Sequence, residues 1–293
     1  MRGFLWYIIR LLISVIVLLY LFDATYTYIY ENGVSRDKIR WVNSVEMPDS
    51  VDYILLGSSR CLNTLIPAVI YQSSGKKGVN LGCSGAGMVE IKLMLKEALK
   101  NIKFRKVFIQ VDTKYDQVTP DRVASVAWMP YIHNNDIYRE YSKYGNEFSA
   151  YRHLPFYRYM HFDSKIGIRN VSLILLKKKG NFVKRDGFVP LFGVKHNNRD
   201  LYFKSMSGKE NPIAKEIIKI CNDNNLELFF FTAPIFNSII DFSLLNRFLP
   251  SYKDFSQVIN EKKYFKDSRH LNNEGARLFS VFFANTYFGN RSD

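Results

Sequence analysis

The residues best suited to chemistry are a serine in the first quarter of the chain and an aspartate and a histidine close to its end. Ser59 lies in the sequence LLGSSRC, directly after a short apolar run. Asp267 and His270 lie three residues apart in DSRHLN. A serine nucleophile needs a base to remove its proton, and that base needs a carboxylate to fix its tautomer and to stabilise its cation. The three residues therefore predict a Ser-His-Asp catalytic triad.

Each part of this triad also has an ordinary explanation. Gly-Ser-Ser is a generic turn sequence, and Asp267 and His270 could be surface residues near the start of a helix. The combination is more specific, because nucleophilic serines often lie where a strand turns into a helix. The free N–H groups of such a turn can stabilise an oxyanion.

The elements that must position these residues follow from the hydrophobic pattern of the chain. Short apolar runs predict strands at 53–56, 78–81, 106–111 and 226–232, and helical periodicity predicts helices at 88–100 and 211–224. A capping asparagine at 272 or 273, with Glu274 in the first turn, predicts a last helix at 273–287. Strands that alternate with helices form a parallel sheet covered on both faces, so an α/β fold is predicted. Ligands bind beyond the carboxyl ends of such strands, which is where the loops GSSR and GCSGAG fall.

The motifs together resemble the SGNH (GDSL-like) hydrolase superfamily. LLGSSR is similar to its first block, with Ser59 as the nucleophile and Ser58 where an aspartate is usual. VNLGCSGAG is similar to the second block, in which the N–H of Gly85 joins that of Ser59 in the oxyanion hole. DSRHLNNEGA is similar to the last block, which contributes Asp267 and His270. The resemblance implies a flavodoxin-like three-layer α/β/α fold and a serine mechanism without cofactor or metal.

The third block departs from the family. The family has Gly-x-Asn-Asp after the third strand, and the asparagine completes the oxyanion hole, whereas here KVFIQV runs into DTKYD. Thr113 or Lys114 is the candidate replacement donor, or the hole has backbone donors alone. Loss of one oxyanion donor commonly costs about two to three orders of magnitude in rate. The protein could therefore be a slow enzyme, a specialised enzyme or an inactive member of the superfamily. Arg60 is a candidate contact for an anionic substrate, with a structural role as the alternative.

The amino terminus predicts a membrane anchor. Residues 3–22 are apolar except for Arg10, and as a helix they would span about 30 Å, the thickness of a bilayer core. Arg2 and Arg10 precede the most apolar run, while Asp23 and Glu31 follow it, so the positive-inside rule places the amino terminus in the cytoplasm and the remainder outside. A signal peptide and a buried soluble helix are the alternatives. No small-residue cleavage site follows the run, and it has no polar face.

The predicted organisation is a transmembrane anchor at 1–24, a juxtamembrane stalk at 25–48 and a hydrolase-like domain at 49–293. An insertion at about 117–210 breaks the alternation of strands and helices and is rich in Tyr, Phe, Arg and Lys. Because a structureless loop of this length is uncommon, we expect a largely helical cap beside the active-site edge. Its aromatic and basic residues suit contact with carbohydrate or an acidic polymer, and an ordinary cap with its own small core is the alternative.

The charge of the chain indicates which classes of partner it could bind, and its cysteines indicate whether a disulfide or a metal site is expected. The chain has 41 basic and 27 acidic residues, a formal charge of +14, which favours anionic lipid, acidic polymer or nucleic acid as a partner. Nucleic acid is the weakest of the three, because neither zinc-finger spacing nor an RNA-binding aromatic signature accompanies the charge. Cys61, Cys83 and Cys221 lack the spacing of a metal site, so free thiols are predicted, with a bridge between Cys61 and Cys83 as the alternative.

The Gly-Ser-Ser block behind an N-terminal membrane helix is similar to the branch that includes the D-alanyl-lipoteichoic-acid transfer protein and alginate acetylation proteins. This resemblance implies a serine esterase or O-acyltransferase that acts on acyl esters, chiefly acetyl esters, of cell-envelope polysaccharide. It also implies a membrane-bound O-acyltransferase as a partner. Two alternatives stay open. One is an inactive SGNH-fold envelope protein that binds glycan or scaffolds the acyltransferase, and the other is an esterase that acts at a lipid surface.

Overall fold

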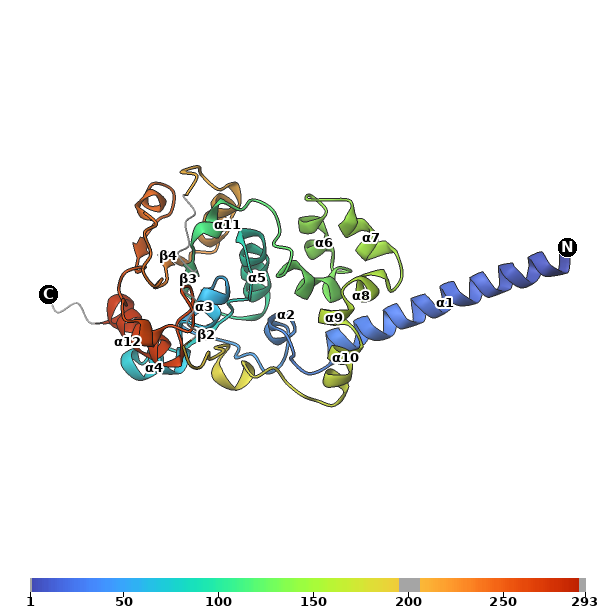
Figure 1. Ribbon diagram of the computed structural model, residues 1–293, viewed down its shortest axis with the longest axis horizontal. Coiled ribbons are helices and arrows are strands. Elements are labelled where there is room, and N and C mark those ends of the chain that lie inside the picture. Colours follow the sequence, from blue (N-terminus) through green and yellow to red (C-terminus); the bar gives the residue numbers. More distant parts are fainter. Residues whose placement is uncertain (1, 195–205, 290–293) are drawn as a thin grey trace. The chain divides into compact units, whose positions relative to one another are not determined.

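The computed structural model describes residues 2–194 and 206–289, and the chain divides into two compact units. The first unit comprises Met1–Trp41 and Ser125–Gly180, and the second comprises Val42–Ala124 and Asn181–Asp293 (Figure 1). Each unit is built from two stretches of chain. The predicted insertion at 117–210 therefore divides between the units, and its residues 195–205 lie outside the described residues.

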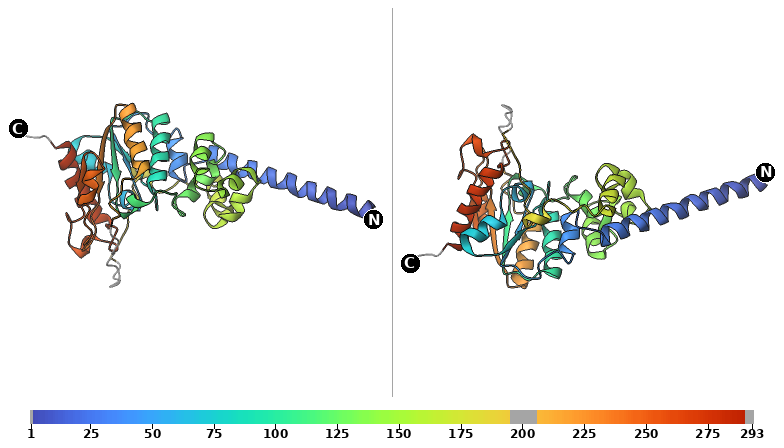
Figure 2. Two further views of the ribbon diagram at one scale, coloured as in Figure 1. Left: turned by 90° about the horizontal axis from the view of Figure 1, so that it is seen from above. Right: turned by 90° about the horizontal axis from the view of Figure 1, so that it is seen from below.

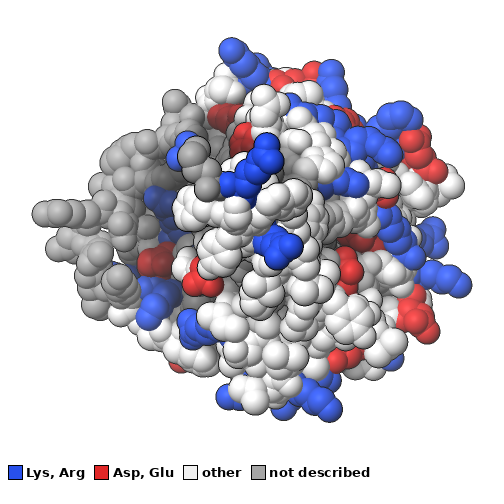
Figure 3. Space-filling view, turned by 90° about the vertical axis from the view of Figure 1, so that its right-hand side faces the viewer, with Lys and Arg blue, Asp and Glu red and all other residues white. Residues whose placement is uncertain are grey.

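Helix α1 (Arg2–Asn32) begins one residue before the predicted apolar run and continues ten residues beyond it. Among the described residues it is the one helix that is long and apolar enough to cross a membrane, and none of its most apolar window is buried. Most large apolar side chains between Phe4 and Phe22 are exposed. In Figure 3, where the N-terminal side faces the viewer, side chains that are neither basic nor acidic occupy most of the middle of the view. An apolar helix without protein around it is suited to lipid.

The other helices of the first unit are short and pack on the carboxyl-terminal part of α1. The contacts with α1 come mainly from a 3₁₀ helix, η2 (Ser125–Tyr131), and from α10 (Ile168–Leu175). Between them lie α6 (Asn135–Tyr141), α7 (Glu147–His153), α8 (Tyr157–His161) and α9 (Asp163–Ile166). Residues 25–32, which belong to the predicted stalk, continue α1, and α2 (Lys38–Val42) follows. Tyr30 within this stretch is only 2% exposed.

The second unit contains a parallel sheet, which confirms the predicted α/β fold with a three-layer α/β/α arrangement. Among the described residues the sheet has five strands in the order β2-β1-β3-β4-β5. The strands are β1 (Tyr53–Leu56), β2 (Gly78–Asn80), β3 (Lys106–Gln110), β4 (Glu227–Thr232) and β5 (Tyr252–Asp254). This is the flavodoxin-like order, in which the connections change direction between β1 and β3. The sequence predicts the first four strands, but β5 has the sequence YKD and no apolar run.

Helices cover both faces of the sheet. On one face α4 (Pro67–Ser74) packs beside α12 (Asn273–Phe288), and on the other α5 (Met88–Asn101) packs beside α11 (Pro212–Asp223). Figure 2 shows the two pairs on opposite sides of the strands. All four residues of β1 are buried, as expected for a strand covered on both faces.

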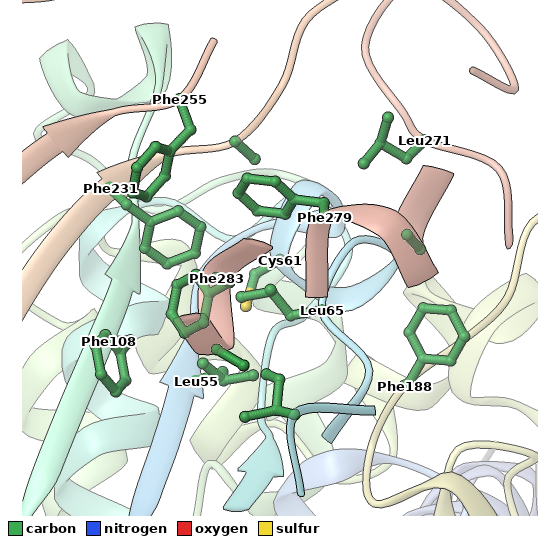
Figure 4. Packing of buried hydrophobic residues seen from close by; sticks show 14 of the residues in the cluster. Leu55, Cys61, Leu65, Phe108, Phe188, Phe231, Phe255, Leu271, Phe279 and Phe283 are labelled. Carbon is green, nitrogen blue, oxygen red and sulfur yellow. The ribbon is translucent and has the colours of Figure 1, made fainter. Parts of the chain in front are cut away.

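The core beneath α12 is aromatic. Phe108 of β3 and Phe231 of β4 pack against Phe283 of α12, with ring centroids 5.0 and 5.3 Å apart (Figure 4). Fully burying a side chain of this size stabilises the fold by about 1.5–3 kcal/mol. Because α12 follows His270 almost directly, this packing fixes the end of the chain against the sheet and limits where His270 can lie.

Candidate active site

The turn that carries Ser59 joins β1 to the short helix α3 (Ser59–Leu62). Gly57 has a φ of +150°, and a Cβ there would lie 2.8 Å from the Cβ atoms of both Cys61 and Gln110, so only glycine fits. Ser58 is the N-cap of α3, and its hydroxyl accepts the N–H of Arg60 at 3.2 Å. Ser59 is therefore the first residue of the helix. Its own N–H has no acceptor among the described residues.

The structure brings together the three residues predicted as a triad. Ser59 Oγ lies 2.8 Å from His270 Nε2, although the two residues are 211 positions apart. His270 Nδ1 lies 2.9 Å from Asp267 Oδ1 and 3.1 Å from Oδ2. If Nδ1 carries the proton and donates it to the carboxylate, Nε2 is left to accept the serine proton. This is the arrangement that general-base activation of a serine requires.

The carboxylate of Asp267 is held by its own loop. Oδ1 also accepts the backbone N–H groups of Arg269 and His270, each at 2.9 Å. Burial tends to raise the pKa of Asp267, but these hydrogen bonds and the His270 side chain outweigh it and lower the pKa to about 2. The group is therefore ionised at any pH at which the fold is expected to persist, and it can stabilise a protonated imidazole.

Gly85 has a second backbone N–H beside Ser59. Its φ of +80° favours glycine, and a Cβ at this position would lie 2.9 Å from Asp121 Oδ1. The N–H of Cys83 donates to Gly57 O at 2.9 Å and ties this loop to the turn that carries Ser59. The N–H of Gly85 has no acceptor among the described residues, and Gly85 lines the same pocket as Ser59 and His270. Two free backbone donors next to a nucleophile can form an oxyanion hole.

Thr113 and Lys114, the two candidates for the missing asparagine, lie in the 3₁₀ helix η1 (Thr113–Asp116), and both line the pocket. Lys114 Nζ donates to Gly85 O at 2.5 Å and to Asp121 Oδ2 at 2.8 Å. Its ammonium therefore holds the loop that presents the Gly85 donor. This contact suits Lys114 to a positioning role rather than to that of a spare oxyanion donor.

Glu90, in the first turn of α5, braces the same loop from behind. Its carboxylate accepts the N–H of Gly87 at 2.9 Å and the N–H of Asp121 at 3.0 Å. Burial raises the pKa of Glu90 to about 7, against the lowering effect of these backbone donors. The chain of contacts from Gly85 through Lys114 and Asp121 to Glu90 stiffens the loop that carries the Gly85 N–H.

Arg60 occupies a structural position, the alternative that the sequence left open. It is 5% exposed, and its guanidinium donates to Asp112 Oδ2 at 3.1 Å and to the carbonyl oxygens of Ala233 and Pro234. The cation thus joins the loops that follow β1, β3 and β4, although part of it still lines the pocket. Burial raises the pKa of Asp112, but Arg60 outweighs this and keeps it below the usual range.

The buried polar residues behind Ser59 were not predicted from the sequence. Ser58 Oγ donates to Gln110 Oε1 at 2.7 Å, and Gln110 Nε2 donates to Asp112 Oδ2 at 3.1 Å. These bonds fix the turn that carries Ser59. One feature of the sequence could have indicated them: Gln110 ends the strand KVFIQ, which is otherwise apolar after its first residue. A buried amide needs hydrogen-bond partners, so polar residues are expected around it.

The pocket at this site has a volume of about 110 Å³. It is lined by Ser58, Ser59, Arg60, Gly85, Asp112, Thr113, Lys114, Ile235, Ile240, Arg269 and His270. An apolar cavity of about 150 Å³ accommodates benzene, so this pocket suits a short acyl group. All the lining residues lie outside the helical segment Ser125–Gly180.

Cys61, Cys83 and Cys221 carry reduced thiols and form no disulfide, so the bridge between Cys61 and Cys83 that the sequence left open is absent. Among residues 2–194 and 206–289, no group of three His, Cys, Asp or Glu side chains could hold a metal ion.

Comparison with known proteins adds little. No protein-family model matches the chain, and no curated protein matches it in sequence. One solved structure is described in the words "The structure of a putative platelet activating factor from Streptococcus pneumonia". It is 10% identical, with a TM-score of 0.38 over 96% of this chain and 98% of that chain. A likeness this weak bears on neither the fold nor the function.

Proposed function

We propose that the protein is an SGNH-type serine esterase or O-acyltransferase that acts on short acyl esters of cell-envelope polysaccharide. The observation that carries the proposal is the 2.8 Å contact between Ser59 Oγ and His270 Nε2, with Asp267 on the other ring nitrogen. The flavodoxin-like strand order, the glycine at position 85 and the motifs around all four residues also support it.

The proposed reaction begins with proton transfer from Ser59 Oγ to His270 Nε2. The alkoxide attacks the ester carbonyl, and the resulting oxyanion accepts the N–H groups of Ser59 and Gly85. Collapse of this intermediate expels the alcohol, which takes the proton from His270, and leaves the acyl group on Ser59. Water or a sugar hydroxyl then gives a proton to His270 and attacks the acyl-enzyme, which releases an acid or a new ester and restores Ser59.

The substrate class follows from the pocket and the charge. Ile235 and Ile240 provide an apolar wall for the methyl end of an acetyl group, and the small volume disfavours long chains. Arg269 is exposed at the pocket beside His270, where a cation suits an anionic polymer. The charge asymmetry around α1 supports a cytoplasmic amino terminus and an extracytoplasmic second unit. The resemblance of the Gly-Ser-Ser block implies a membrane-bound O-acyltransferase as the source or recipient of acyl groups.

A covalent test addresses the proposal directly. The detergent-solubilised full chain should react with a fluorophosphonate probe, and mass spectrometry should place the adduct on Ser59. Hydrolysis of nitrophenyl esters should be fastest for acetyl and fall with acyl length. Ser73→Ala, at an exposed serine outside the site, is the matched control and should label normally. A folded protein without labelling would favour the inactive glycan-binding or scaffolding alternative, and a preference for long acyl chains would favour a lipid-surface esterase.

The positioning role of Lys114 gives a separate prediction. Lys114→Met removes the side chain that donates to Gly85 O. The loop around Gly85 should then become more mobile, and the Gly85 N–H should no longer point at the proposed oxyanion. We expect the rate of Ser59 labelling and kcat for acetyl esters to fall up to about 100-fold, with KM little changed, because a misplacement of about 1 Å can cost that much. Lys76→Met, at an exposed lysine, is the control. An unchanged rate would show that the Gly85 loop holds its place without Lys114.

A further inference from the structure

The length of α1 sets the level at which the first unit meets the membrane. The helix has 31 residues, or about 46 Å at 1.5 Å per residue, and a bilayer core accepts about 20 residues of it. The apolar run ends at Phe22, so Asp23 and the residues after it lie at the headgroup layer. Burial by protein also begins at this point, since Phe22 is 51% exposed and Asp23 is 8% exposed.

Phe156 contacts α1 at this same level. Its ring centroid lies 5.6 Å from that of Phe22 and 4.9 Å from that of Tyr26. Its backbone N–H donates to Asp23 Oδ1 at 2.8 Å. Phe156 has a φ of +61°, a left-handed conformation that is strained for a residue with a side chain and is held here by the contact with Asp23.

A buried ion pair makes this attachment rigid. Arg158 Nη1 lies 2.8 Å from Asp23 Oδ1, and the Arg158 side chain is fully buried. Arg158 Nη2 also donates to Thr27 Oγ1 at 2.7 Å, and His133 Nε2 lies 3.3 Å from Asp23 Oδ2. The segment around Phe156 therefore cannot move along α1 without leaving a charge buried and unpaired.

Two large apolar side chains near Phe156 in the sequence are only half covered by protein. Leu154 and Met160 are each 52% exposed. At the end of α10 the unit also exposes Leu175, its last residue, and Leu176, its C-cap, at 63% and 66%. That helix meets α1 near Gly33, where a Cβ would collide with Ile174. Gly33 is eleven residues beyond Phe22, or about 16 Å further from the apolar run.

We propose that residues 154–160 form a membrane foot, which rests in the interfacial layer of the bilayer that α1 crosses. Leu154 and Met160 enter this layer, while the aromatic ring of Phe156 joins the foot to the helix at the level where aromatic side chains favour the interface. The exposed side chains of residues 154–160 lie at the level where the apolar run of α1 ends, so the surface that they form is continuous with a surface suited to lipid. We therefore infer that lipid covers these side chains. Two contacts with the bilayer, one spanning and one interfacial, then fix the height and rotation of the first unit. The inference depends on α1 spanning a membrane and not on the proposed enzyme activity.

Spin labels measure the depth of the foot. Full chains carrying Leu154→Cys, Met160→Cys or, as the matched control, Leu175→Cys are labelled and placed in nanodiscs that contain lipid and no other protein. Labelled unmodified chain corrects for the native thiols. Relaxation by dissolved oxygen should exceed relaxation by a water-soluble nickel complex at 154 and 160, and the order should reverse at 175.

A second measurement needs no substitution. Hydroxyl-radical footprinting of the unmodified chain in the same nanodiscs should leave Met160 nearly unoxidised, although methionine is reactive and this one is half exposed on the protein. Leu175 and Leu176 should be oxidised. Aqueous accessibility at 154 and 160 equal to that at 175, together with rapid oxidation of Met160, would overturn the proposal and leave the patch to a protein partner.

Discussion

Ser59→Ala and His270→Ala are each expected to lower kcat for an acetyl ester by about 10⁶-fold, and the double variant should lose no more than either single one. The serine hydroxyl and the imidazole act as a unit, because the oxygen is nucleophilic only while Nε2 removes its proton across the 2.8 Å contact. Removing either leaves the same residual machinery, which is the oxyanion donors and the pocket. Asp267→Asn should cost about 10⁴-fold, because an amide fixes the wrong tautomer of His270.

These losses are measured as steady-state rates on nitrophenyl acetate in detergent, at equal concentrations of folded protein, and fluorophosphonate titration counts the active sites of the unsubstituted chain and of Ser73→Ala. Ser73→Ala supplies the control for substitution of a serine. Additive losses in the double variant would mean that Ser59 and His270 act separately. Full activity in any single variant would remove that residue from the mechanism.

Asp112→Asn is expected to destabilise the protein by about 3–5 kcal/mol, the usual cost of leaving one member of a buried ion pair without its partner. The side chains of Arg60 and Asp112 are only 6% and 11% exposed, and Arg60 also holds two carbonyl oxygens of the loop after β4. Without the carboxylate, the guanidinium must stay charged in a buried site. The turn that carries Ser59 should loosen with it.

The free energy of unfolding from urea titration of the full chain measures this effect. Arg60→Met/Asp112→Leu should recover much of the loss, because an apolar pair removes both buried charges. Asp223→Asn breaks the exposed pair with Lys219 and should change stability by less than about 1 kcal/mol. If Asp112→Asn and Asp223→Asn had equal effects, the buried pair would not be what stabilises the turn.

The sequence by itself determined the features that depend on neighbouring residues. The apolar run from Gly3 to Phe22 predicts α1 because composition alone decides whether a helix suits lipid. The strands β1 and β3 follow from short apolar runs, α5 follows from hydrophobic periodicity, and α12 follows from its capping residues. Asp267 and His270 were identifiable together, because three residues separate them and their contact forms within one loop.

Only the tertiary structure decided the contacts between distant segments. Arg60 looked like a substrate contact or a structural residue until the chain placed it on Asp112, 52 residues away. Lys114 reaches Gly85 across 29 residues, and Arg158 reaches Asp23 across 135, with no local pattern that predicts either pairing. The physical reason is that the partner of a buried charge is chosen by which loops the sheet order and helix packing bring together. Propensity and periodicity describe a residue's neighbours along the chain and carry no information about that choice.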